Sequence, residues 1–349
     1  MNSESTLSEP ESARSASKLL PSLGILLVTG GLFLLGWVAY RWSLPEPPPY
    51  RYQLVEEGTA EKFEKLGLKE FPQLSISKFE IRVDNVDKPL AVAYRASRSP
   101  SPPVLLYLEN QFPEPISTME VMLSETTALS AALSKHVPKD AVILSWWDTS
   151  RRLALLSERQ MLFSSYLGKP IITPSYWRDR TQSIAQYEAE FWGSLPSAEE
   201  EQQFEKFVDA LIAFPNQGAV MLRELVGARE AYVVVHVSDI YKLGLMRPER
   251  IEVAFKDFPL TGNVHGLTNQ VKAWLGENEY SSYTLQSLSE KIVRAFFLRE
   301  GGGSNILLAK MLPFSNARPL DLTALQLTHK EGGYWIYKVP TADELKGRN

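Results

Sequence analysis

The longest apolar stretch of the chain lies near its N-terminus, at residues 19–42. No charged residue stands between Lys18 and Arg41. At about 1.5 Å of rise per residue, a helix over this stretch reaches across the ~30 Å core of a bilayer. Its C-terminal end carries the aromatic residues typical of a membrane interface, namely Trp37, Tyr40 and Trp42. The pattern predicts a single transmembrane helix, with a cleavable signal peptide as the alternative.

The segments on either side of this predicted anchor have no apolar periodicity. Residues 1–18 are rich in Ser and Glu, which predicts a disordered tail. Residues 43–50 are rich in proline, which is typical of a semi-rigid spacer. Basic residues flank the span on both sides, so charge alone does not set its orientation. The short N-terminus and the large C-terminal body favour a single-pass protein of the inner membrane with a periplasmic body.

The remaining body, residues 51–340, is predicted to mix strands and helices. Period-two alternation predicts strands early in the body, and continuous apolar runs at 141–146 and 231–237 predict buried strands. A helical pattern follows each buried run, which is the order of a βα unit. Ser197 and Glu200 fit a capping box at the start of an amphipathic helix. The early strands are expected at 75–83, 90–94 and 104–108.

The C-terminal third completes the predicted fold. Two helices are expected, at 284–298 and 304–312. A hairpin of strands follows, at 322–328 and 334–339, joined through Gly332 and Gly333. We therefore expect an α/β fold in which one α/β domain with a central mixed sheet follows the anchor and ends in a tail at 341–349.

Composition narrows the function classes. Hydrophobic residues make up 44% of the 349, enough for a packed core, and the net charge of −4 gives no basic footprint for nucleic acid. The chain has no cysteine, which excludes disulfides, thiolate zinc sites, iron–sulfur clusters and the C-x-x-C-H haem attachment. Its four histidines are not at metal-binding spacing. We expect neither a metal nor another cofactor.

Two groups of polar and aromatic residues stand where the buried strands end. In open α/β sheets, ligands bind at this edge. The first group begins at Trp146, and the second places Asp239, Lys242 and Met246 on one helix face, at i, i+3 and i+7. If the two strands are parallel neighbours, Lys242 should lie near Asp148 or Asp239. The candidate ligand-binding residues are Trp146, Trp147, Asp148, Ser150, Arg151, Asp239, Lys242 and Met246.

Each group also has a plainer interpretation. Asp148 and Asp239 would serve as helix caps, Lys242 would be solvated, and Met246 and the tryptophans would pack in the core. A third interpretation makes the two aspartates metal ligands, together with one or two further oxygen ligands.

Together the two groups resemble the catalytic-subunit family of oligosaccharyltransferases, over about residues 115–340. Its soluble C-terminal domain carries Trp-Trp-Asp-Tyr-Gly, matched at 146–148 and departing at Thr149 and Ser150. An Asp-x-x-Lys-x-x-x-(Met/Ile) motif is matched at 239–246. The resemblance implies a pocket that binds the hydroxyl of an acceptor sequon. It does not extend to glycosyl transfer, because that family uses acidic residues and a metal in a many-helix membrane domain.

Over nearly its whole length the chain resembles the HaoB family, the hydroxylamine oxidation proteins of ammonia oxidisers. The likeness includes the N-terminal anchor, the size of the body and the stretch from 143–153 through 169–172. It implies an accessory rather than catalytic role in nitrification, with the multihaem hydroxylamine oxidoreductase or associated cytochromes as partners. The leading hypothesis is a membrane-anchored accessory protein that binds a protein or peptide partner. The alternative is a peptide- or sugar-binding envelope protein derived from an oligosaccharyltransferase-like domain.

Overall fold

The computed structural model describes residues 16–43, 47–99, 101–112, 114–157, 159–193, 196–260, 264–299 and 301–347. The chain divides into two compact units, residues 1–47 and 48–349. In the first unit, the described residues up to 43 form helix α1 (Ala16–Ser43). Its segment Pro21–Trp42 is long and apolar enough to cross a membrane, a test that a signal sequence near the N-terminus also passes. Most of the predicted tail and part of the proline-rich spacer lie outside the described residues.

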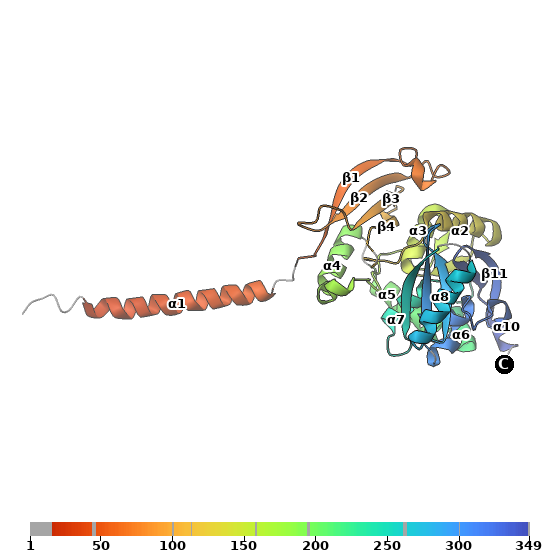
Figure 1. Ribbon diagram of the computed structural model, residues 1–349. Helices are drawn as coiled ribbons and strands as arrows, with labels where there is room; N and C mark the ends of the chain where they lie inside the picture. Colours follow the sequence, from red (N-terminus) through yellow and green to blue (C-terminus); the bar gives the residue numbers. More distant parts are fainter. Residues whose placement is uncertain are drawn as a thin grey trace, which may run out of the picture. The chain divides into compact units, whose positions relative to one another are not determined.

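Within its described residues, the body contains three β-sheets (Figure 1). The first is antiparallel, in the order β1-β2-β3-β4. The strands expected early in the body are present, but β1 was not predicted from the sequence, because a register shift between Leu54 and Glu56 interrupts its pattern and most of its side chains are exposed. The bounds are β1 (Arg51–Thr59), β2 (Ser75–Arg82), β3 (Ala91–Ser97) and β4 (Val104–Asn110).

The second sheet is the predicted central mixed sheet, in the order β11-β12-β7-β5-β6. Strand β5 pairs in parallel with both β7 and β6, whereas β12 is antiparallel to β7. Every residue of β5 and β7 is buried, as their continuous apolar runs predict. The bounds are β5 (Val142–Ser145), β6 (Gln160–Met161), β7 (Ala231–His236), β11 (Gln326–Glu331) and β12 (Tyr334–Lys338).

The third sheet is antiparallel, in the order β8-β10-β9, and corrects one prediction. The helix expected at 284–298 is wrong, because this segment forms most of β9 (Ser282–Ser287) and all of β10 (Ile292–Leu298), beside β8 (Val253–Pro259). Alternate residues of β10 pack in two different hydrophobic clusters, Phe297 in one and Phe296 in the other. A strand buried on both faces shows no polar alternation, and its apolar run is easily mistaken for a buried helix.

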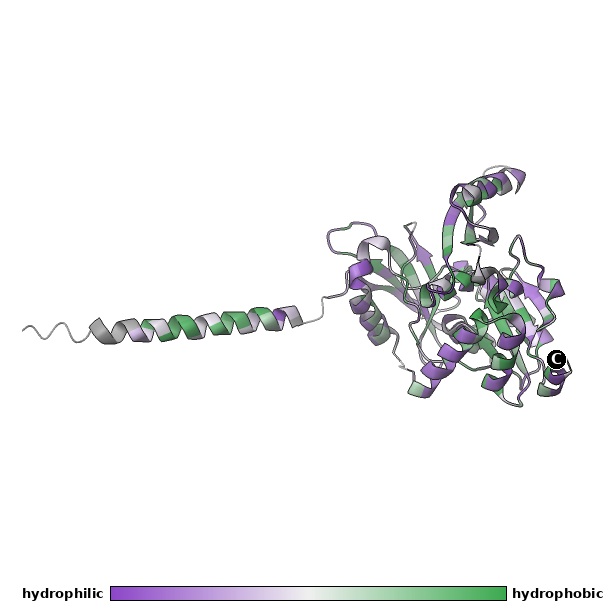
Figure 2. Cartoon of the chain, turned by 90° about the horizontal axis from the view of Figure 1, so that it is seen from below, coloured by the Kyte–Doolittle hydropathy of each residue, from purple (hydrophilic) through white to green (hydrophobic). Residues whose placement is uncertain are grey.

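Helices pack on both faces of the central sheet. On one face, α2 (Leu123–His136) joins a cluster with Ile143 and Val234; on the other, α5 and α6 form the main core with Leu144 and Val235. Figure 2 shows hydrophilic residues on several of the helices of the body. The remaining helices are α3 (Trp147–Ser157), α4 (Thr181–Trp192), α5 (Ala198–Ile212), α6 (Pro215–Val226), α7 (Asp239–Met246), α8 (Val264–Glu277), α9 (Leu307–Met311) and α10 (Ala342–Lys346).

The structure tests two local predictions, the capping box at Ser197 and the C-terminal tail. Ser197 caps α5 by accepting a hydrogen bond from the Glu200 amide at 3.1 Å. The Glu200 carboxylate accepts from the amides of Ser164 and Ser165, so it also ties a loop to the helix start. The tail at 341–349 contains the short helix α10, which begins with a complete capping box at Thr341.

Candidate functional site

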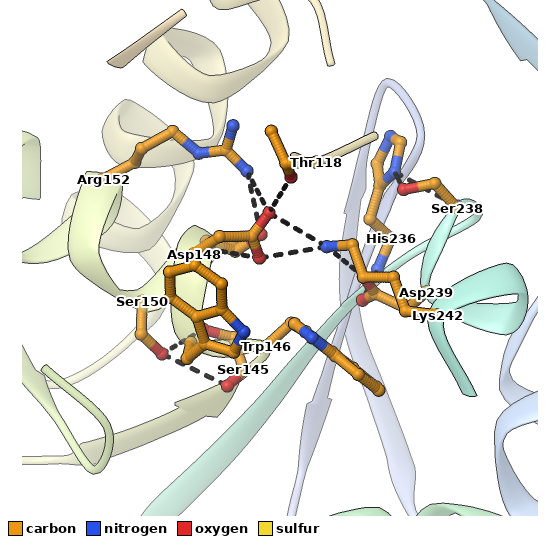
Figure 3. A network of polar contacts seen from close by, with 12 residues as sticks. Thr118, Ser145, Trp146, Asp148, Ser150, Arg152, His236, Ser238, Asp239 and Lys242 are labelled. Carbon is orange, nitrogen blue, oxygen red and sulfur yellow. Dashed lines mark hydrogen bonds and ion pairs between the residues drawn. The ribbon is translucent and has the colours of Figure 1, made fainter. Parts of the chain in front are cut away.

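The two predicted groups of residues meet at one edge of the central sheet. Strands β5 and β7 are parallel neighbours, so the helices that follow them, α3 and α7, begin side by side. Lys242 Nζ lies 2.9 Å from Asp148 Oδ1 and 3.1 Å from Asp148 Oδ2, and 3.1 Å from Asp239 Oδ1 (Figure 3). The prediction that Lys242 lies near Asp148 or Asp239 is confirmed, and the structure places it beside both.

Asp148 is buried and surrounded by donors from its own chain. Besides Lys242, it accepts hydrogen bonds from Thr118 Oγ1 at 3.0 Å, Arg152 Nη2 at 3.3 Å and the Thr149 amide at 2.8 Å. It lies within the first turn of α3 rather than at the cap position. Burial alone would raise the pKa of Asp148, but the cations Lys242 and Arg152 outweigh it and hold that pKa well below its usual range.

Lys242 is not the solvated lysine of the plainer interpretation, because its side chain is only 3% exposed. Burial lowers its pKa, but Asp148 and Asp239 more than offset this, so the pKa of Lys242 is raised and the ammonium is charged. Asp239 Oδ2 accepts from the backbone amide of His236 at 2.8 Å. The ammonium lies between the two carboxylates, in the position that a shared metal ion would need.

The indole groups of Trp146 and Trp147 also form hydrogen bonds within the chain. Both N–H groups donate to the backbone carbonyl of Lys169, at 3.0 and 2.6 Å, and both side chains are buried. Trp147 meets the ring of Tyr166 edge-on, with centroids 4.8 Å apart. The tryptophans therefore hold the loop around Lys169 against the end of β5.

The other candidate residues contact groups other than Asp148 and Lys242. Ser150 Oγ lies 2.7 Å from Ser145 Oγ. Arg151 donates to the Pro103 carbonyl at 2.7 Å, and its guanidinium carbon lies 5.5 Å from the centre of the Tyr166 ring. Burial lowers the pKa of Arg151 to about 10. Met246 is half-buried against the main core. Arg152, rather than Arg151, is the arginine that pairs with Asp148.

A further buried carboxylate, Glu188 of α4, was missed from the sequence. It accepts hydrogen bonds from four neutral donors: the Tyr50 hydroxyl, the Tyr52 hydroxyl at 2.7 Å, Ser117 Oγ at 2.9 Å and Trp192 Nε1 at 2.8 Å. Burial raises the pKa of Glu188 even though all four donors act to lower it. The i, i+4 spacing of Glu188 and Trp192 was the available signal.

A small cavity is lined by Asp148 and by two of the residues that bind Glu188. Ser117, which binds Glu188, and Thr118, which binds Asp148, both line it. It offers about 20 Å³ to the centres of water molecules, enough for about one or two of them. Tyr166 Oη, Arg151 Nε and Arg152 Nε are buried there without a hydrogen-bond partner in the described part of the chain. Water would satisfy these groups, whereas a peptide or a sugar is too large for the cavity.

Comparison with known proteins places the chain in a family. The model of the family described as HaoA-associated protein HaoB matches residues 16–339. The chain belongs to this family. The matched range includes α1, Asp148, Asp239 and Glu188. No curated protein matches the chain.

One solved structure with some similarity is the crystal structure of the C-terminal domain of PglB from C. jejuni. It is 11% identical, with a TM-score of 0.35, and the alignment covers 61% of this chain and 99% of that domain. A likeness at this score supports no inference about function.

Proposed function

We propose that this protein is a membrane-anchored accessory protein of hydroxylamine oxidation that binds the hydroxylamine oxidoreductase HaoA. The observation that carries the proposal is the family match, which runs from the start of α1 to residue 339 and belongs to a family described as HaoA-associated. The match covers the apolar helix as well as the body, which favours one protein that combines an anchor with a binding domain.

The geometry of the buried centre supports a structural role for it rather than catalysis. Asp148, Asp239, Lys242 and Arg152 form a network in which two carboxylates face two cations. The cavity beside this network has room for water only. A network of this kind stabilises the first turns of α3 and α7 and leaves no place for a reacting substrate.

Binding to HaoA is tested with the full-length chain in mild detergent. The chain is immobilised, and purified HaoA is passed over it while haem absorbance is recorded. We expect saturable capture of HaoA, and no capture of horse heart myoglobin, a haem protein of near-neutral net charge that controls for non-specific retention. Equal retention of both proteins, or of neither, would contradict the proposal.

The anchor and its orientation need a separate test. Alkaline phosphatase, which is active in the periplasm, is fused after Asn349, and cells are fractionated. We expect phosphatase activity in the membrane fraction. Activity in the soluble periplasmic fraction would instead indicate a cleaved signal peptide, and an inactive fusion that is present at normal level would place the body in the cytoplasm.

A further inference from the structure

A groove on the body lies apart from the buried centre. It is lined by residues of β4, of the segments that follow β4 and β9, of β8 and of β10, and it shares no lining residue with the cavity beside Asp148. Its volume is about 530 Å³, within the range of ~300–1,000 Å³ typical of ligand sites. We call it the β4 groove.

The β4 groove has exposed apolar residues in its lining. Phe112, just after β4, and Ile292, at the start of β10, are both 42% exposed. Large apolar side chains that line a concave surface gain free energy when a partner covers them. These two residues supply the apolar contacts of the groove.

The charges in the groove are mostly negative. Glu109, Glu120 and Asp257 line it together with a single cation, Arg294. Arg294 is only 1% exposed; its Nε and Nη2 donate to Asp257 at 2.6 and 2.8 Å, and Nη2 lies 3.2 Å from Glu120. With three carboxylates against one guanidinium, the groove favours a cationic occupant.

Three buried polar atoms in the lining have no hydrogen-bond partner among the described residues. Two are donors, Arg294 Nη1 and Asn110 Nδ2, and one is an acceptor, Asn110 Oδ1. Unpaired buried polar groups cost stability, and an occupant that supplies both acceptors and a donor would satisfy them. A peptide backbone offers both kinds of group in its C=O and N–H.

We propose that the β4 groove binds an extended basic segment of a protein partner. The segment would pair its backbone with Arg294 and Asn110, place a Lys or Arg near Glu109 and pack apolar side chains on Phe112 and Ile292. We take HaoA as the source of this segment, and only this choice of source rests on the proposed function.

The groove is tested first with peptide probes that do not depend on HaoA. Full-length protein in mild detergent is titrated into a fluorescein-labelled hexapeptide of alternating Leu and Arg, and into a matched probe of Leu and Glu. We expect the Leu-Arg probe to bind at least tenfold more tightly than the Leu-Glu probe, and less tightly as salt is raised. Equal binding of the two probes would overturn the proposal.

Variants then assign the binding to the groove. Glu109 and Ile292 are exposed, so Glu109→Lys and Ile292→Ser should leave the fold intact, as circular dichroism can check. We expect each to weaken binding of the Leu-Arg probe about tenfold, the first by reversing a charge and the second by removing an apolar contact. Glu224→Lys and Leu320→Ser make the same changes at exposed positions outside the groove and should bind as the unmodified protein does. If groove and control variants bind alike, the groove is not the site.

The same variants separate this proposal from the proposed function. If unmodified protein captures HaoA and the groove variants capture it equally well, the groove proposal fails and the function stands. If the probes discriminate as expected but HaoA is not captured, the proposed function fails and the groove remains a site for basic segments. Loss of HaoA capture in the groove variants alone supports both.

Discussion

Asp148 and Glu188 are two buried carboxylates near one small cavity, and they differ in the residues that surround them. Asp148 faces two cations, Lys242 and Arg152. Among the described residues, the donors to Glu188 are all neutral. The pKa of Asp148 is lowered and that of Glu188 is raised. Burial opposes ionisation at both sites, so the charge of the donors decides the direction in which each pKa moves.

The difference also determines how much stability each site loses when one partner is removed. At the Asp148 site, removing one partner leaves a buried charge without compensation. At the Glu188 site, a proton can neutralise the carboxylate, so losing a donor costs about one hydrogen bond. The comparison predicts large losses of stability on the charged side and small ones on the neutral side.

The largest effect is expected for Lys242→Met. It removes the ammonium from between Asp148 and Asp239 and leaves both carboxylates buried, which should lower the free energy of unfolding by about 3–5 kcal/mol. Urea unfolding at pH 7 measures it. Lys346→Met is the control, because that side chain is 81% exposed and should change stability by about 0.5 kcal/mol or less. Similar losses in the two variants would refute the charged network.

A smaller loss is expected for Asp148→Asn, about 2–4 kcal/mol at pH 7, because Lys242 keeps Asp239 as a partner. The loss should depend on pH. The folded pKa of Asp148 lies below its ordinary value of 3.8, so its ionisation stabilises the fold above that value, and the contribution disappears as the pH falls through the folded pKa. The stability gap to the unmodified protein should shrink as the pH falls below about 4. A gap independent of pH would contradict this.

Glu188→Gln should show the opposite trend with a smaller loss, about 1–2 kcal/mol at pH 4. The folded pKa of Glu188 lies above its ordinary value of 4.5. Its protonated form is therefore the more stable one in the fold, and the protein loses stability as the pH rises from 4.5 through the folded pKa. The uncharged Gln does not titrate, so the gap between the two proteins should narrow with rising pH. Unfolding at a series of pH values measures it, and a widening gap would mean that Glu188 is held ionised.

The sequence was sufficient for part of this site. The apolar runs of β5 and β7 predicted two buried strands. On the condition that these strands are parallel neighbours, the helices that follow them begin at one edge of the sheet, which places Lys242 near Asp148. The burial of Lys242 could not be predicted, because helical spacing identifies a face but not what covers it. The Glu188 cluster could not be predicted either, since Tyr50 and Ser117 are 138 and 71 residues from Glu188 along the chain. The β4 groove likewise depends on segments that only the tertiary fold brings together.

The smallest effect is expected for Tyr52→Phe, which removes one donor from Glu188. The Tyr52 ring stacks on Phe191 with centroids 4.0 Å apart, and Phe retains this packing, so the loss should be about 1 kcal/mol. Because the donor stabilises the carboxylate, its removal should raise the pKa of Glu188 further and move the loss of stability to higher pH. Tyr94→Phe is the control, since Tyr94 stacks on Tyr107 in another cluster. If Tyr52→Phe left the pH dependence of unfolding unchanged, as Tyr94→Phe should, the Tyr52 hydroxyl would not be a donor that sets the pKa of Glu188.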